Sequence, residues 1–429
     1  MTLIKNIIII DLKLGDGSAL LLNGINGSIT KIGKEERDII ERWIIGPITP
    51  VSSKEHTVFR YLMDNQFIMD IDSEMQIKNH VISKIKDKIN HNDKSSAKAW
   101  FILSYNCNFD CPYCYERGLS NKKILTKEMV DQIFEQNPGI DRIGFFGGEP
   151  FLPSHKEIIM YIISKAPSAC FFAITNGYNL HEYIPILRDL NVSFIQVTLD
   201  GSEANHNRTR HTRGGQPTYQ KIIAGIIECT QFNIPVTIRM NISEANKEDC
   251  LSEMARIKKT EWGKKVQFEL QPLFQYSCSE RMELQKALFA EEAHPKENKI
   301  FQKMLPLANF LYHGTRLVPI LRACDAEQKN RFYDPDGNMY NCILAVGNQN
   351  KSIGSYYPTQ QFKDKSFLTR DITTIEICKS CKYSLFCGGG CPNALPEDCD
   401  IYSPNCTSLG SELETLIPLI CQKEGYNLE

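Results

Sequence analysis

Alternating strand-like and helix-like segments restrict the fold of this chain more than any other feature. Six apolar, strand-like runs follow one another between residues 97 and 273: AWFILSY, RIGFFGGEP, CFFAITNG, SFIQVTLDG, PVTIRMNIS and KVQFELQPL. Helical spacing follows the runs at 126–136, 155–165, 180–190, 218–230 and 247–259. Such repeats predict a parallel sheet, and six units are too few to close an eight-stranded barrel. We therefore expect an α/β fold with a partial, TIM-like (β/α)6 barrel.

Polar and cysteine residues gather where these strands end. In parallel α/β folds the functional site lies at the carboxyl ends of the strands. After the second run, Gly147 and Gly148 let the backbone approach a ligand closely, and the carboxylate of Glu149 can accept hydrogen bonds. The candidate residues at these strand ends are Cys107, Gly147, Gly148, Glu149, Pro150, Asn176, Asp200 and Asn241.

The chain has 16 cysteines, which is many for a chain without a recognisable secretion signal. One group is spaced C-x3-C-x2-C and consists of Cys107, Cys111 and Cys114. A second group consists of Cys324, Cys342, Cys378, Cys381, Cys387, Cys391, Cys399 and Cys406. Clustered cysteines in such a chain indicate metal binding rather than disulfides. The first group provides three thiolates for the irons of an iron–sulfur cluster; a zinc site would need a fourth ligand.

The regions on either side of the predicted barrel differ from it. Residues 1–95 contain no cysteine and show short strands, a turn at Asn26-Gly27 and helices, which suits a small winged-helix-like domain. Residues 96–300 form the predicted barrel domain. Residues 301–429 contain turn-rich hairpins such as YDPDGNMYNC and little apolar periodicity. We expect this third domain to depend on metal for its folding.

Charge and hydropathy exclude some classes of function. The net charge is −2 and the pI is about 6.5, so nothing favours nucleic-acid binding. Apolar runs are only a few residues long, whereas a membrane span needs about 20. The expected location is the cytoplasm.

The cysteine loop, with Tyr113 before its last cysteine, resembles the signature of radical S-adenosylmethionine (SAM) enzymes. The resemblance implies a 4Fe–4S cluster on Cys107, Cys111 and Cys114, with one iron left for SAM. It further implies that the cluster reduces SAM to a 5′-deoxyadenosyl radical that abstracts hydrogen. GGEP matches the family segment for the amino group of SAM. TNG and LDG, followed by HNRTR, resemble further family segments, which makes Asn176, Asp200 and, by its similar place, Asn241 cofactor contacts.

The second cysteine group resembles the SPASM extension of radical SAM enzymes, and this implies two auxiliary 4Fe–4S clusters, three clusters in all. By the family pattern, the first takes Cys324, Cys342 and Cys391. The second takes Cys378, Cys381, Cys387 and Cys406, with Cys399 as a rival for the last position. The fourth ligand of the first auxiliary cluster stays open between a substrate thiolate and another side chain.

The first 95 residues resemble the leader-binding segment of enzymes that mature ribosomally made (RiPP) peptides. We therefore expect an oxidoreductase that takes hydrogen from a precursor peptide and installs a thioether or carbon–carbon cross-link. A flavodoxin- or ferredoxin-type protein is the expected reductant. One alternative is a sulfatase-maturing enzyme that makes formylglycine, although Ile343 stands after Cys342 where those relatives have an aspartate. The other is a non-catalytic iron–sulfur electron carrier. No catalytic side chain is assigned.

Overall fold

The computed structural model describes residues 2–91, 97–119, 123–273, 318–323, 330–363, 369–395, 399–406, 414–415 and 417–418. Of the predicted site residues, Cys324 lies outside these ranges, as does the predicted boundary at residues 300–301. Within the described ranges, no helix is both long enough and apolar enough to cross a membrane.

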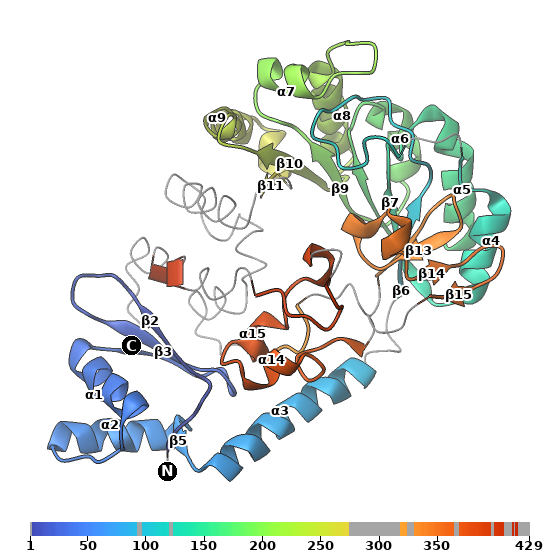
Figure 1. Ribbon diagram of the computed structural model, residues 1–429. Coiled ribbons are helices and arrows are strands. Elements are labelled where there is room, and N and C mark those ends of the chain that lie inside the picture. Colours follow the sequence, from blue (N-terminus) through green and yellow to red (C-terminus); the bar gives the residue numbers. More distant parts are fainter. Residues whose placement is uncertain are drawn as a thin grey trace.

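Six parallel strands form the barrel sheet, and they neighbour one another in the order of the sequence (Figure 1). They are β6 (Ala97–Ile102), β7 (Ile140–Phe146), β8 (Cys170–Thr175), β9 (Val192–Thr198), β10 (Val236–Ile242) and β11 (Gln267–Pro272). Consecutive neighbours with helical crossovers are the topology of a partial barrel. The predicted fold class is thus confirmed.

Helices cover the outer face of this sheet. They are α4 (Lys127–Gln136), α5 (Lys156–Lys165), α6 (Leu180–Leu187), α8 (Tyr219–Gln231) and α9 (Lys247–Lys258). Their apolar stripes pack on strand residues such as Phe101, Ile143 and Ile238, all fully buried. On the inner face, Trp100 stacks on Phe332 with ring centroids 5.3 Å apart. Both faces of each strand are therefore buried, which explains the nearly continuous apolar runs in the sequence.

One helix lies where the sequence favoured a loop. Helix α7 (Glu203–Thr209) follows β9 and has no apolar periodicity. It is held by His206, whose Nδ1 accepts a hydrogen bond from the Asp200 backbone N–H at 3.2 Å. The other ring nitrogen lies 3.1 Å from Thr218 Oγ1. A buried histidine thus replaces the usual apolar stripe, which is why periodicity did not reveal the helix.

A C-terminal hairpin extends the barrel sheet to ten strands. Strand β12 (Asn330–Tyr333) pairs in parallel with β6, and β13 (Asn338–Tyr340), β14 (Gly354–Ser355) and β15 (Gln361–Phe362) follow antiparallel. The buried Asp334 carboxylate accepts hydrogen bonds from Tyr105 Oη at 2.9 Å and Tyr340 Oη at 3.0 Å. The hairpin predicted from YDPDGNMYNC is confirmed. Through Asp334, the hairpin connects Tyr105, at the start of the cysteine loop, to Tyr340 on β13, the strand that precedes Cys342.

The N-terminal region has its own core. A three-stranded antiparallel sheet consists of β2 (Ile7–Asp11), β3 (Ala19–Asn23) and β4 (Ile29–Ile32). Around it lie α1 (Lys34–Ile45), α2 (Ser53–Asp64), α3 (Ile71–His91) and a ribbon of β1 (Thr2–Leu3) with β5 (Ile68–Met69). Ser52 and Glu55 form a capping box that starts α2. The winged-helix-like character of this region stays a prediction.

In the described part of the cysteine-rich C-terminal region, the elements beyond the hairpin are short. They are α14 (Glu376–Ser380) and α15 (Ser384–Cys387). Short 3-10 helices occur in this region at η5 (Ile343–Ala345), η6 (Gln349–Lys351) and η7 (Pro392–Ala394), and in the barrel at η2 (Pro153–His155) and η3 (Gly263–Lys265). In Figure 1 this region lies between the barrel and the N-terminal region, beside α3.

Candidate cofactor and cluster sites

The C-x3-C-x2-C loop leaves the carboxyl end of β6 and precedes α4. It is held by a second loop, because Asp110 N–H donates to His211 O at 3.2 Å and Arg213 N–H donates to Asn108 O at 2.9 Å. Cys111 is buried, Cys107 is half-buried and Cys114 is exposed. The parallel sheet and the second loop together bring the predicted cysteines to one place at the strand ends.

The thiols of this loop are close enough to influence one another. The pKa of Cys107 is raised to about 12, mainly by burial and also by the neighbouring charges of Glu149 and Cys111. Burial also raises the pKa of Cys111 and of Cys114, each against the attraction of Arg210. A bound iron would supply the positive charge that stabilises the thiolates. Within the described residues, no group of three or more His, Cys, Asp or Glu side chains is arranged to hold a single metal ion.

The glycine pair after β7 comes into close contact with the cysteine loop. Gly147 (φ 87°) and Gly148 (φ 48°) both adopt left-handed conformations. A Cβ atom on Gly148 would lie 2.1 Å from the carbonyl oxygen of Asn106, so only glycine fits. The Glu149 N–H donates to the same carbonyl at 2.8 Å. The pair therefore forms a backbone surface directly beside Cys107.

Glu149 connects the ends of β7 and β8. Its carboxylate is 1% exposed and accepts from the Phe151 N–H at 2.9 Å, the Asn176 N–H at 2.7 Å and Thr175 Oγ1 at 2.5 Å. Burial raises the pKa of Glu149 while these hydrogen bonds lower it. Its neighbour Pro150 has its carbonyl oxygen 3.0 Å from His155 Nδ1. Most of the hydrogen-bonding capacity of Glu149 is therefore used by the chain itself.

A second carboxylate, which the sequence reasoning missed, lies against the glycine pair. Glu116, two residues after Cys114, is 9% exposed, and its Oε2 accepts from the Gly148 N–H at 2.9 Å. Its Oε1 is buried and has no hydrogen-bond partner. Burial raises the pKa of Glu116 to about 7. A buried carboxylate oxygen without a donor is costly, so this atom is suited to receive one from a bound ligand.

Asp200, Tyr113 and Arg210 form a buried network beside the cysteines. Tyr113 Oη donates to Asp200 Oδ2, and Arg210 Nη1 donates to Tyr113 Oη at 2.7 Å. Asn241 Nδ2 contacts Asp200 Oδ1 at 3.5 Å, so the structure brings the predicted Asp200 and Asn241 together. Burial raises the pKa of Asp200, and the Arg210 guanidinium opposes that shift.

Arg210 is the other functional residue that the sequence reasoning did not select. It is 8% exposed, and its Nε is buried without a hydrogen-bond partner. It is the last residue of HNRTR, a segment that had been noted without choosing among its side chains. A buried guanidinium with a free donor attracts a carboxylate or another anion.

Asn176 is the predicted residue closest to a thiol. Its Nδ2 donates to Asn108 Oδ1 at 2.7 Å and lies 3.8 Å from Cys107 Sγ. Its backbone N–H donates to Glu149, as described above. Asn176 therefore joins the end of β8 to the cysteine loop.

The C-terminal cysteines fall into two groups. Burial raises the pKa of Cys378 and of Cys387, and the neighbouring thiols of Cys381 and Cys406 raise both further in the same direction. Cys391 acts in the same way on Cys342, whose pKa is raised mainly by burial. These groups coincide with the two predicted ligand sets as far as they lie in the described residues. Cys399 is exposed.

A single buried arginine holds the loops that carry these cysteines. Arg370 is 0% exposed and donates to four backbone carbonyl oxygens. The acceptors are Gly389 at 2.8 Å, Gly390 at 3.1 Å, Ile401 at 2.7 Å and Ser403 at 3.0 Å. Arg370 thus ties the segment between Cys387 and Cys391 to the segment before Cys406. No local pattern in the sequence marks it.

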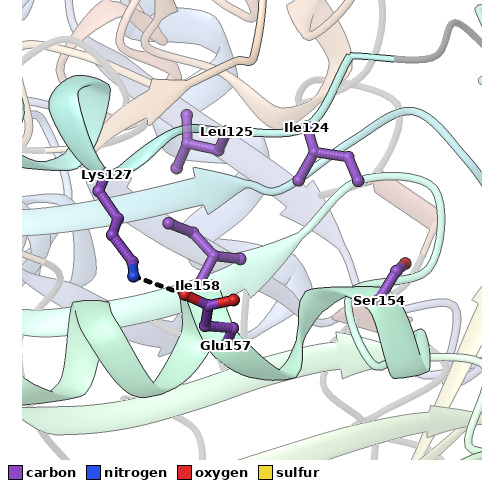
Figure 2. Close-up of a pocket in the computed structure, with 6 residues that line it drawn as sticks. All are labelled: Ile124, Leu125, Lys127, Ser154, Glu157 and Ile158. Carbon is purple, nitrogen blue, oxygen red and sulfur yellow. Dashed lines mark hydrogen bonds and ion pairs between the residues drawn. The ribbon is translucent and has the colours of Figure 1, made fainter.

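A separate pocket lies in the helical layer of the barrel. Figure 2 shows its lining, which consists of Ile124, Leu125, Lys127, Ser154, Glu157 and Ile158. The Lys127–Glu157 ion pair spans it. It contains neither a cysteine nor a residue of the strand-end network, so it does not belong to the candidate site.

Known proteins are similar to this chain in the barrel. The Radical SAM superfamily matches residues 101–256. The sporulation killing factor maturation protein SkfB of Bacillus subtilis is 26% identical over 152 residues, which are 34% of this chain and 36% of SkfB. The segments matched in the first curated relatives span 40% or less of their length.

Two solved structures share the fold over a larger part of the chain. The structure of anSMEcpe with bound AdoMet and the Kp18Cys peptide has a TM-score of 0.58 at 16% identity and covers 77% of this chain and 99% of its own. Streptococcus suis SuiB bound to precursor peptide SuiA has a TM-score of 0.51 at 13% identity and covers 95% and 100%. At these identities the likeness concerns the fold. Residues 101–256, which carry the cysteine loop, the glycine pair and the Asp200 network, are the part of the chain that matches the Radical SAM superfamily.

Proposed function

We propose that this chain is a radical SAM oxidoreductase that matures a ribosomally made precursor peptide by installing a cross-link. One observation carries the proposal. The three loop thiols lie at the carboxyl ends of the parallel strands, beside two buried polar atoms that lack a partner, Glu116 Oε1 and Arg210 Nε. This donor set suits a cluster with an open iron and a ligand that has both an amino group and a carboxylate.

The residues that would hold the cofactors follow from this geometry. Cys107, Cys111 and Cys114 would bind three irons of a 4Fe–4S cluster. Glu116 would accept a hydrogen bond from the amino group of SAM, and Arg210 would pair with its carboxylate. Because Gly147 and Gly148 have no side chains, the backbone there would let SAM come close enough to make both contacts. When bound, the cluster and SAM supply a 5′-deoxyadenosyl radical that removes a hydrogen atom from the peptide.

The C-terminal cysteines would bind two auxiliary clusters. Cys378, Cys381, Cys387 and Cys406 provide four thiolates for one of them, which closes its coordination. Cys342 and Cys391 belong to the other, together with Cys324. In thioether formation a C–H and an S–H bond break and a C–S bond forms. The hydrogen atom would leave on 5′-deoxyadenosine, the thiol proton would go to solvent, and an auxiliary cluster held by these cysteines would accept the remaining electron.

The peptide substrate is inferred from the N-terminal region. Its sheet has the order β2-β3-β4, so β2 and β4 are edges to which an extended peptide could add a strand. A leader held there would raise the local concentration of the attached core peptide at the barrel. SuiB, whose structure contains a precursor peptide, has a fold that covers 95% of this chain.

The test uses the anaerobically purified full-length enzyme, loaded with clusters and reduced by a flavodoxin or ferredoxin. The peptide is the product of a short, cysteine-rich reading frame beside the gene. We expect 5′-deoxyadenosine and a peptide that has lost two hydrogens, located by tandem mass spectrometry. Cys114→Ala is the matched control and should yield neither product. An unchanged peptide without 5′-deoxyadenosine refutes the proposal, and formylglycine in a sulfatase peptide would favour the sulfatase-maturing alternative.

A further inference from the structure

The N-terminal region packs directly on the loop that carries Cys378 and Cys381. Asn6 Nδ2 lies 3.4 Å from the Cys381 carbonyl oxygen and 3.5 Å from that of Lys382. Lys78 Nζ, on α3, donates to the Lys379 carbonyl oxygen at 2.8 Å. Figure 1 shows α3 running beside α14 and α15. The contacting residues are 301 or more positions apart in sequence, yet three carbonyl groups of the ligand loop, those of Lys379, Cys381 and Lys382, contact the N-terminal region.

Helix α3 belongs to two hydrophobic cores at once. Ile77 and Val81 pack on the core of the N-terminal sheet. Ile82 and Ile85, on the next turns, pack on a C-terminal cluster that includes Cys378 itself. That cluster consists of Leu321, Ile372, Ile375, Cys378 and Leu385. Apolar packing on both sides fixes the helix against the cysteine loop rather than leaving the two regions in occasional contact.

Lys78 brings a positive charge to this contact. It is half-buried, and burial lowers its pKa, while Glu74 and the Cys381 thiol favour its charged form. Glu74 is 7% exposed and accepts from the Lys5 N–H at 2.8 Å. The Lys78 ammonium therefore lies between a carboxylate of its own region and a cysteine of the C-terminal region.

We propose that α3 is part of the second auxiliary cluster site and that Lys78 is a positioning residue for it: it holds the ligand loop through Lys379 and places a cation beside Cys381. This inference rests on the proposed function, which assigns Cys378, Cys381, Cys387 and Cys406 to a cluster. A nearby cation stabilises the more negative, reduced form of a cluster, so it raises the reduction potential. The N-terminal region, which we propose to bind the leader, would thereby also influence the reduction potential of the second auxiliary cluster.

The experiment isolates the auxiliary clusters in the full-length chain. In the variant with Cys107, Cys111 and Cys114 all replaced by Ala, iron can reside only at the C-terminal sites. Into this parent we would introduce Lys78→Met, which keeps the length of the side chain but removes the charge. Lys78→Arg retains the charge. Lys86→Met is the matched control, because Lys86 lies on the same helix and contacts Thr373 Oγ1 at 3.1 Å.

The readouts are a potentiometric titration followed by EPR and the rate of iron loss to a chelator. With Lys78→Met, we expect one of two auxiliary signals to move to lower potential and iron loss to become several-fold faster. Lys78→Arg and Lys86→Met should match the parent. A parent without iron refutes the auxiliary clusters themselves. An iron-loaded parent that Lys78→Met leaves unchanged, or that Lys86→Met alters equally, refutes only the role of Lys78.

Discussion

The two cysteine sites of this chain are held in place by different means. The first lies at the ends of parallel strands, whose ladders and two apolar faces fix it. The second lies among short helices and loops, where Arg370 and the contact with α3 replace a sheet. Regular hydrogen bonding defines the first site before any metal binds. The second consists of segments that have few contacts other than the cysteines and one arginine.

Removal of iron should affect the two sites unequally, and this is the largest effect we expect. Structural metal contributes about 10 kcal/mol to the folding of small metal-dependent regions. Amide exchange in residues 369–406 should therefore become about 100-fold faster or more in the chelated protein. Strands β6 to β11 should exchange nearly as before, because their core is almost entirely apolar and, of the three loop cysteines, includes only Cys111. Hydrogen-exchange mass spectrometry measures both regions at once, and equal acceleration in both would contradict the comparison.

Arg370→Met should have the next largest effect and act on the second site alone. One buried and three partly buried carbonyl groups lose their donor, at about 1–3 kcal/mol for each group left unsatisfied in the interior. We expect the loss of about four irons per chain, as one 4Fe–4S cluster, with SAM binding retained. Iron analysis and equilibrium dialysis with SAM measure these two properties.

Arg188→Met is the matched control for this change, because Arg188 is half-exposed, and its contacts are an ion pair with its neighbour Asp189 and the Phe232 ring, 5.9 Å away and far from the cysteines in sequence. It should leave both iron content and SAM binding as they are. If Arg370→Met keeps its full iron content, the arginine does not organise the cysteine loops.

Glu116→Gln tests the first site. A hydrogen bond to a charged group contributes about 1.5–3 kcal/mol, so SAM affinity should fall by about 10- to 100-fold. Iron content should not change, since Glu116 is not a cluster ligand. Isothermal titration with cluster-loaded protein measures the affinity. Glu157→Gln, at an exposed glutamate of the helical layer, is the control. Unchanged affinity in Glu116→Gln, with a loss in Glu149→Gln, would assign the amino group to Glu149 instead.

The sequence predicted the position of the barrel site better than the polar contacts within it. All six strands and five of the helices followed from apolar periodicity, because burial on both faces leaves a strong pattern. The three-cysteine loop followed from its spacing, and the division of the C-terminal cysteines followed from the resemblance to the SPASM extension. Glu116, Arg210 and Arg370 were missed, since each acts through contacts with residues distant in sequence. Helix α7 was missed because a buried histidine holds it. Long-range polar contacts leave no periodic signal in a single sequence.

The smallest expected effect concerns Lys98, near the amino end of β6 and away from the cysteines. Its ammonium lies 4.8 Å from the Trp100 ring and 4.5 Å from the Phe172 ring. Burial, and the nearby Arg142, lower the pKa of Lys98 to about 8, against about 10.4 in the unfolded chain. The folded state is therefore penalised fully below pH 8. Its stability should rise between about pH 8 and 10.4, where only the unfolded chain still binds the proton.

Lys98→Met removes this penalty, so it should be more stable than the parent at pH 7, by about 1 kcal/mol once partial exposure and the ring contacts are allowed for. The advantage should shrink as the pH approaches 10. Urea unfolding followed by tryptophan fluorescence between pH 7 and 10 measures it. Lys221→Met removes an exposed lysine 3.8 Å from the Tyr178 ring and should show no such trend. If Lys98→Met is less stable than the parent at pH 7, the Trp100 and Phe172 rings compensate for burial of the charge. The barrel then tolerates a partly buried cation, as we propose that the C-terminal site does with Lys78.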